Sequence, residues 1–129
     1  MLQRDYISRL IREFMAALQR NLEKDEIRER RHAIEDLYRQ YFGDYTFYHI
    51  SSIDEIMQSF ERYPAEERLS RIEMLAELYF SEADLLTEPM RTNQLDLAYR
   101  LFDFINRNSK TYSFDRINKM KQIKPTIDK

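Results

Sequence analysis

Two histidines are the side chains in this 129-residue sequence that best suit metal binding or proton transfer. Glu29 and His32 have the Glu-x-x-His spacing that helical bundles use to hold iron or manganese, because both side chains then lie on one helix face. A two-metal site needs a second such motif, but His49 is preceded at that spacing by Thr46. The two arginines inside the motif would also repel a cation. The sequence therefore predicts no metal site.

Motifs for nucleophilic catalysis and for phosphate binding are absent from the sequence. Either histidine could act as a base, but no Gly-x-Ser-x-Gly elbow or comparable nucleophile accompanies it. A chain with one glycine cannot contain a P-loop or a dinucleotide fingerprint. A chain without cysteine has no thiol nucleophile, no disulfide and no cysteine-based metal site. We therefore predict no catalytic residues and no cofactor, and a protein that is not an enzyme.

Six aromatic side chains stand within eleven residues near the middle of the chain. Tyrosine offers a large contact area with a polar tip, which suits a partner-binding surface. The alternatives are a small hydrophobic core beneath a long connection, and stacking on single-stranded nucleic acid, which Asp36 and Asp44 disfavour. The candidate partner-binding residues are Tyr38, Tyr41, Phe42, Tyr45, Phe47 and Tyr48.

The composition indicates a chain made almost entirely of helices. It has one glycine and three prolines, whereas strand-and-turn architectures depend on these residues, which average about 7% and 5%. A hydrophobic share of 43% with 8 Phe and 9 Tyr argues against disorder. We expect residues 1–124 to form a single all-α domain of five to six helices packed as antiparallel hairpins. Residues 125–129 are expected to be a flexible tail.

Apolar periodicity and capping residues give the expected positions of these helices. They are placed at about 2–23, 26–42, 53–62, 65–83, 93–108 and 114–122. The expected N-caps are Asp25, Ser51 or Ser52, and Ser113. Gly43 is the expected left-handed residue after the second helix. Residues 44–50 are expected to be a short extended connection, and Pro125 to end the order of the last helix.

The segment 71–80 is the most apolar part of the chain. On a helical wheel Leu75 and Tyr79 share one broad face, while Met74 and Leu78 lie on the opposite side. A helix that is apolar on two sides must be covered on two sides. We therefore expect this helix to be buried, with the helix at 93–108 as its antiparallel partner.

These two helices carry a repeat-like pattern. Ile72, Leu75-Ala76 and Tyr79, followed by Ala98 and Phe102, have the spacing of a tetratricopeptide repeat, although Ile105 is larger than the residue usual at its position. The connector is about ten residues longer than in the standard unit, and no proline closes it. Residues 69–110 thus resemble one elongated, degenerate tetratricopeptide repeat. The resemblance implies a right-handed superhelix that binds proteins; a compact bundle is the alternative.

Two further features bear on origin and location. The opening segment 5–11 resembles the start of small bacterial proteins, which implies a bacterial, intracellular helical domain. The N-terminus lacks the apolar core of a signal peptide, and no run approaches the roughly 18 apolar residues of a membrane span. We therefore expect a soluble, cytoplasmic protein.

The function that these features favour is that of a non-enzymatic adaptor. It would bind a protein or peptide through a groove between hairpins or through the aromatic cluster. The alternative is a nucleic-acid-associated protein that uses the basic segment 110–129, with Arg116, Lys119, Lys121 and Lys124. A small helical enzyme built around a histidine and a buried carboxylate is the third reading. A homodimer is expected, because the apolar faces of the helices at 2–23, 65–83 and 93–108 are wide for one small core.

Overall fold

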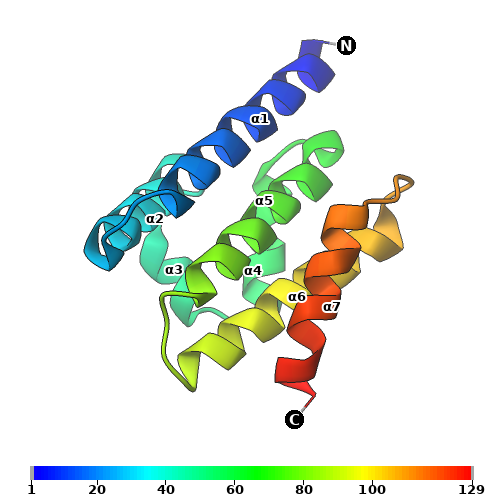
Figure 1. The fold of residues 1–129 in the computed structure, drawn as a ribbon. Helices are drawn as coiled ribbons and strands as arrows, with labels where there is room; N and C mark the ends of the chain where they lie inside the picture. Colours follow the sequence, from blue (N-terminus) through cyan, green and yellow to red (C-terminus); the bar gives the residue numbers. More distant parts are fainter. Residues whose placement is uncertain (1, 129) are drawn as a thin grey trace. The chain divides into compact units, whose positions relative to one another are not determined.

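The computed structural model describes the backbone of residues 2–128 and the side chains of residues 6–128, and within that range the chain forms helices and no strands (Figure 1). The all-α class is confirmed, while the expected count of five to six helices is too low. In chain order the elements are α1 (Leu2–Leu22), α2 (Ile27–Tyr41), α3 (Tyr45–Ile50), α4 (Ile53–Ser59), the 3₁₀ turn η1 (Phe60–Arg62), α5 (Ala65–Ala83), α6 (Met90–Asn108) and α7 (Phe114–Ile127).

The chain divides into two compact units. Unit 1 comprises Met1–Ser70 and unit 2 comprises Arg71–Lys129. The boundary lies inside α5, so that its first turns belong to unit 1 and the rest to unit 2. Each unit has its own helix packing and its own hydrogen bonds.

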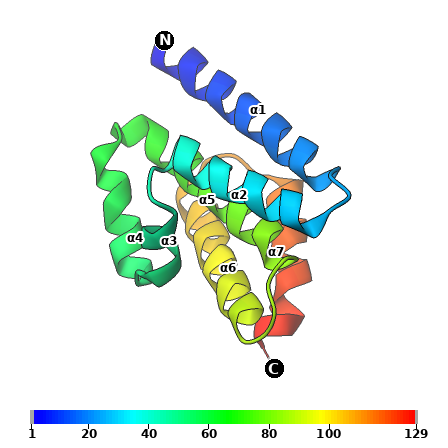
Figure 2. The ribbon, with the colours of Figure 1, turned by 90° about the vertical axis from the view of Figure 1, so that its left-hand side faces the viewer.

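Unit 1 begins with a helical hairpin in which α1 and α2 lie side by side (Figures 1 and 2). The rings of Phe14 and Tyr41 meet edge to face with centroids 5.1 Å apart. The expected N-cap Asp25 is wrong by one residue: Glu26 occupies that position and makes no side-chain capping bond. The turn is held instead by the guanidinium of Arg30, whose Nε donates to the carbonyl of Lys24 at 2.6 Å.

The expected extended connection at 44–50 is wrong, because it forms the helix α3. Asp44 caps this helix by accepting the backbone N–H of Thr46 at 3.0 Å. One helical turn brings the rings of Tyr45 and His49, four residues apart, onto the ring of Tyr38 in α2. This ring packing with α2 overrides the strand-like composition of a segment too short to be a stable helix alone.

Two expected caps in unit 1 are confirmed. Gly43 follows α2 with a φ of 101°, and its N–H donates to the carbonyl of Tyr38 at 3.0 Å. Ser52 begins α4 with a capping box, in which its hydroxyl accepts the N–H of Glu55 and the carboxylate of Glu55 accepts the N–H of Ser52. These two caps fix the directions in which the chain leaves α2 and enters α4.

Unit 2 contains the remainder of α5, with α6 and α7. Helices α6 and α7 pack on one another as a hairpin (Figure 1). Gln94 links α6 to α5, because its amide donates to the carbonyl of Tyr79 at 3.1 Å and to the carboxylate of Glu82 at 2.7 Å. The side chains of Met74 and Leu78 are as buried as that of Tyr79. This confirms that the apolar stretch of α5 is covered on both sides.

Two boundaries in unit 2 differ from the expected ones. Helix α6 begins at Met90 rather than at 93, because the carboxylate of Glu88 accepts the N–H of Thr92 at 2.9 Å and caps the first turn. Pro125 does not end α7, which continues to Ile127. A proline removes one N–H and bends a helix, and the buried side chain of Ile123 anchors the last turns. The N-cap Ser113 is confirmed, since its hydroxyl accepts the N–H of Arg116.

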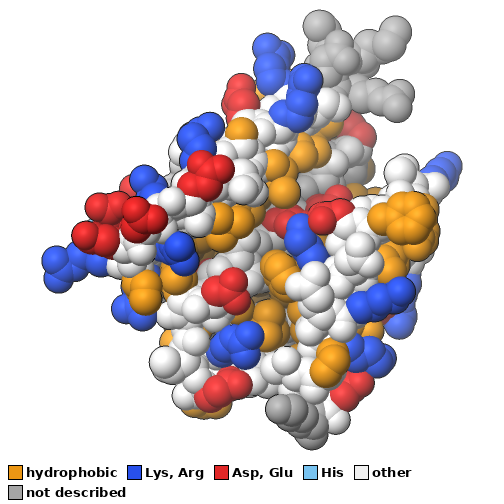
Figure 3. Space-filling model, viewed as in Figure 1, with side chains coloured by type: hydrophobic (Ala, Val, Ile, Leu, Met, Phe, Trp, Pro, Cys, Tyr) orange, Lys and Arg blue, Asp and Glu red, His pale blue; other side chains and the backbone are white. Residues whose placement is uncertain are grey.

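The basic segment at the C-terminus is largely engaged within unit 2. Arg116 is only 4% exposed and binds the carboxylate of Glu73 at 2.8 Å. Lys119 binds the carboxylates of Glu77 and Asp115 at 2.6 and 2.7 Å. On the face seen in Figure 3, lysines and arginines are interspersed with acidic side chains rather than gathered together. Of the four cations expected to contact nucleic acid, Arg116 and Lys119 therefore form ion pairs that link α7 to α5.

Candidate binding pocket

The six aromatic residues expected to bind a partner divide into two groups. Tyr38, Phe42 and Tyr48 are at most 2% exposed and belong to the core of unit 1. The other three, Tyr41, Tyr45 and Phe47, are half-buried. The cluster is thus partly a core beneath α3 and partly a surface.

The buried group is held by edge-to-face ring contacts. The ring of Phe42 meets the ring of Tyr48 at 5.5 Å and the ring of Phe60 at 6.3 Å between centroids. Each such aromatic pair contributes about 0.5–1.5 kcal/mol beyond the burial of its area. These residues position the surface around them, and their removal would disturb folding before it disturbed binding.

A pocket of about 450 Å³ opens beside this core, entirely within unit 1. It is formed where the end of α2, the helix α3 and the end of α4 with η1 converge. We call it the Arg62 pocket, and its lining residues are Phe42, Gly43, Asp44, Phe47, Tyr48, Ser59 and Arg62. Three of the six expected residues line it, whereas Tyr38, Tyr41 and Tyr45 do not.

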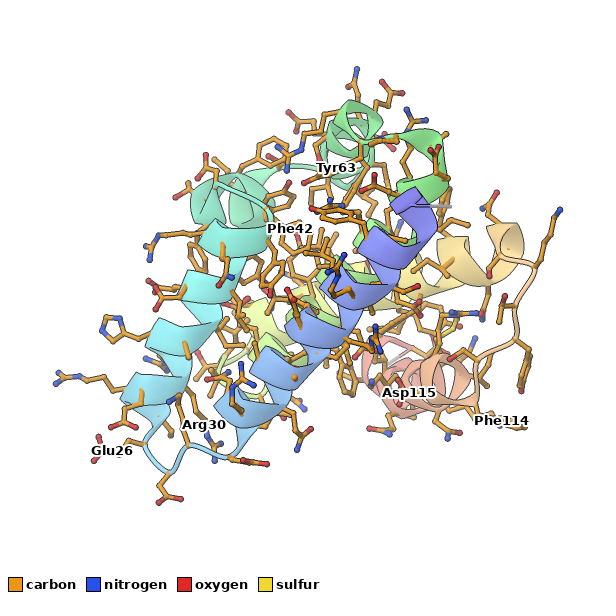
Figure 4. The ribbon with its side chains drawn as sticks, turned by 90° about the horizontal axis from the view of Figure 1, so that it is seen from above. Glu26, Arg30, Phe42, Tyr63, Phe114 and Asp115 are labelled. Carbon is orange, nitrogen blue, oxygen red and sulfur yellow. The ribbon has the colours of Figure 1, made fainter. Side chains whose placement is uncertain are left out.

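Arg62 is held in place by one edge of its guanidinium. Its Nη2 donates to the carbonyl of Phe42 at 2.8 Å, to the hydroxyl of Tyr48 at 3.2 Å and to the hydroxyl of Tyr63 at 2.7 Å. The guanidinium also lies 4.8 Å from the centre of the Tyr63 ring. Figure 4 shows Phe42 and Tyr63 close together at this end of unit 1. Within the described part of the chain, no carboxylate pairs with Arg62.

Two further polar groups line the pocket, the hydroxyl of Tyr48 and the carboxylate of Asp44. Burial raises the pKa of the Tyr48 hydroxyl above its ordinary value of 10.0, even though the hydrogen bond with Ser59 and the charge and hydrogen bond of Arg62 lower that pKa. The hydroxyl is therefore neutral at physiological pH. The Asp44 carboxylate is exposed and accepts the N–H of Thr46 as the N-cap of α3. The pocket thus combines an apolar floor, a cationic wall and one carboxylate.

Sequence reasoning missed Arg62 as a site residue. Two of its three acceptors, Tyr48 on α3 and Phe42 at the end of α2, lie 14 and 20 residues away in the chain. No local motif marks an arginine at the end of a short helix. The aromatic cluster was the sequence feature that pointed to the pocket, because it contains the lining residues at the end of α2 and on α3.

The two histidines do not lie in the pocket. The ring of His49 stacks on the ring of Tyr45 at 3.9 Å, and its Nδ1 lies 2.7 Å from the carbonyl of Tyr45. Both Glu29 and His32 are exposed on α2. Among the described residues, no three His, Asp or Glu side chains lie close enough together to hold a metal ion.

No protein-family model matches this chain, and no curated protein or solved structure is significantly similar to it. The tetratricopeptide-like resemblance therefore stays a prediction. Its positions at Leu75, Ala76 and Ala98 are buried, as they would be in any packed pair of helices. In the part of the chain that the structure describes, no helix is long and apolar enough to cross a membrane.

Proposed function

We propose that this protein is a non-enzymatic binding module whose Arg62 pocket receives part of a protein partner. The observation that carries the proposal is the composition of the pocket: the rings of Phe47 and Tyr48 line it together with an arginine that no carboxylate of the described residues pairs with. The pocket volume of about 450 Å³ lies in the range of about 300–1,000 Å³ usual for ligand sites.

The pocket chemistry favours binding over catalysis. Its one hydroxyl nucleophile, Ser59, donates to the carbonyl of Ile56 at 2.6 Å. Neither histidine lines the pocket, and in the described part of the chain no hydrogen bond joins Ser59 to Asp44, the carboxylate that lines it. An aromatic and arginine pair is instead typical of the residues that dominate protein interfaces.

A tetratricopeptide-like role is part of this proposal. The helices α5 and α6 would form one long hairpin of a peptide-binding superhelix, and the hydrogen bond from the amide of Gln94 to the carbonyl of Tyr79 supports their pairing. Such modules bind extended peptides on a concave face.

The burial of apolar residues in α5 and α6 weakens the reason for expecting a homodimer. That expectation depended on wide apolar faces in three helices, but most of the apolar residues of α5 and of α6 are buried within the chain. Self-association stays a prediction. Sedimentation at micromolar concentration tests it, and a single monomeric species would contradict it.

Photo-crosslinking tests the proposed function. Benzoylphenylalanine replaces Phe47, which lines the pocket, or Ile50, which lies on the same helix with 78% of its surface exposed. Both proteins are irradiated in an extract of the source cells. We expect discrete crosslinked proteins from position 47 that position 50 does not give. The same products from both positions would show that contact depends on exposure alone, and would contradict the proposal.

A further inference from the structure

We propose that the occupant of the Arg62 pocket is the C-terminal residue of a partner protein. Its α-carboxylate would bind the guanidinium of Arg62, and its apolar side chain would pack on the rings of Phe47 and Tyr48. This inference rests on the proposed function and adds the chemistry of the partner.

Arg62 has N–H donors that make no hydrogen bond within the described chain. All its hydrogen bonds within the described chain are made by Nη2, so Nε and Nη1 keep three N–H donors for a ligand. The side chain as a whole is exposed. The free N–H donors of a guanidinium bind a carboxylate through charge-assisted hydrogen bonds, and this guanidinium is already held in position by Phe42 and the two tyrosines.

The guanidinium of Arg62 lies close to the aromatic residues that form the apolar floor of the pocket. Nη2 of Arg62 lies 3.2 Å from the Tyr48 hydroxyl and 2.8 Å from the Phe42 carbonyl. A ligand must therefore carry its negative charge and its apolar group close together. In an extended peptide, neighbouring side chains point to opposite sides, so an internal acid and its apolar neighbour would not both enter. A C-terminal residue carries both groups on one Cα.

At the rim of the pocket, Gly43 has no side chain, and no atom of the described residues lies within 4 Å of the position that a Cβ would take. This leaves space for the chain that leads to the bound residue. Asp44 adds a negative charge to the rim, so a second acidic group in the ligand would be repelled. The preferred partner therefore ends in an apolar residue preceded by a neutral or basic one.

Calorimetric titration of the full chain with three defined peptides tests the inference. The first is acetyl-Ala-Ala-Ala-Phe with a free C-terminus, the second is the same peptide as its C-terminal amide, and the third is acetyl-Ala-Glu-Phe-Ala amide. We expect the free acid to bind at least about tenfold more tightly than either amide. The first amide lacks the carboxylate, and the second carries its carboxylate and its ring on neighbouring residues, which point to opposite sides of an extended peptide.

Arg62→Gln should remove this preference, while Arg39→Gln should keep it. Arg39 is an exposed arginine of the same unit that does not line the pocket, so the second variant matches the change in net charge. Because Arg62 also supports Phe42 and Tyr63, Arg62→Lys provides a variant that keeps the cation and should retain part of the preference. Each variant is checked by circular dichroism for an unchanged helix content.

The outcomes separate this inference from the proposed function. Equal binding of the free acid and its amide would overturn the carboxylate assignment and leave the pocket as a site for apolar groups. Tighter binding of the peptide with an internal glutamate would overturn the assignment to a chain end. Binding of none of the three peptides would overturn the inference, while crosslinking at position 47 would still decide the proposed function.

Discussion

Lys119 of α7 places its ammonium nitrogen 2.6 Å from Oε2 of Glu77 in α5. Glu77 is the one polar residue between Met74 and Phe80, and its side chain is only 6% exposed. Asp115, one turn before Lys119, binds the same ammonium at 2.7 Å. A buried acid in the most apolar helix of the chain thus has its counter-charge in the basic segment, and the two together fasten α7 to α5.

Lys119→Met should destabilise the protein strongly. The substitution leaves the Glu77 carboxylate buried without its cation, and loss of one partner of a buried ion pair costs about 3 kcal/mol or more. Urea unfolding followed by circular dichroism measures the change. The double variant Lys119→Met/Glu77→Leu should recover most of the loss. Simple addition of the two single effects would contradict the coupling.

The matched control for that variant is Arg100→Met. Arg100 pairs with Asp96 at 2.9 Å across one turn of α6, with 61% of its side chain exposed. Such surface pairs contribute about 0–1 kcal/mol. A loss as large as that of Lys119→Met would indicate that burial is not what distinguishes the two pairs.

The Lys119–Glu77 pair should lose its contribution in alkali. Burial lowers the pKa of Lys119, but hydrogen bonds and charges from Asp115 and Glu77 outweigh it and raise that pKa above the ordinary 10.5. A raised pKa in the folded state gives stability that is complete below the unfolded value and is lost as the pH rises through the folded value. The difference in unfolding free energy between wild type and Lys119→Met should therefore be constant from neutral pH to pH 10.5 and shrink above it. A difference that shrinks between neutral pH and that value would contradict the assignment.

Gly43→Ala should destabilise the protein by about 1 kcal/mol, because a Cβ is strained at positive φ. The φ of 101° is the cause, since no neighbouring atom would clash with the new carbon. For a chain of this size the melting temperature should fall by about 4 °C. Gly43→Asn should lose less, since asparagine tolerates this conformation better. An unchanged melting temperature for the alanine variant would remove the assignment.

Binding to a polyanion should depend weakly on residues 110–129. Arg116 and Lys119 are engaged within unit 2, which leaves Lys121 and Lys124 more open to solvent. The salt slope of binding to heparin should therefore stay at or below about 2, and Lys121→Gln/Lys124→Gln should hardly change the elution. A steep slope that the double variant abolishes would favour the nucleic-acid function. Point substitutions are preferable to deletion, which would also remove the ion pairs that Arg116 and Lys119 make with Glu73 and Glu77 of α5.

Much of the helical framework was predictable from local chemistry. The bounds of α5 agree with the expected 65–83, because Pro64 and the acidic first turn mark its start. Ser52, Ser113 and Gly43 take their expected capping positions for similar reasons. Each of these signals acts within a few residues of the chain.

The parts that were not predicted depend on distant contacts. The helix α3 has a strand-like composition, and the rings that support it come from α2. The candidate site was half predicted: Phe42, Phe47 and Tyr48 line the pocket, but the arginine that gives it a charge was not recognised. The fold brings Arg62 to the carbonyl of Phe42 and the hydroxyl of Tyr48, which are distant in the sequence. The periodicity of apolar residues along a helix does not reveal such contacts.

An amide chemical-shift titration of the full chain tests the central claim most directly. The ¹⁵N-labelled protein is titrated with acetyl-Ala-Ala-Ala-Phe, and the exposed rings of Tyr112 and Phe114 serve as an internal control for non-specific aromatic contact. We predict saturable shifts at Gly43, Phe47 and Ser59 in the Arg62 pocket, with little change at Tyr112 and Phe114. Shifts centred on Tyr112 and Phe114, or shifts that do not saturate, would contradict the assignment of the pocket as the binding site.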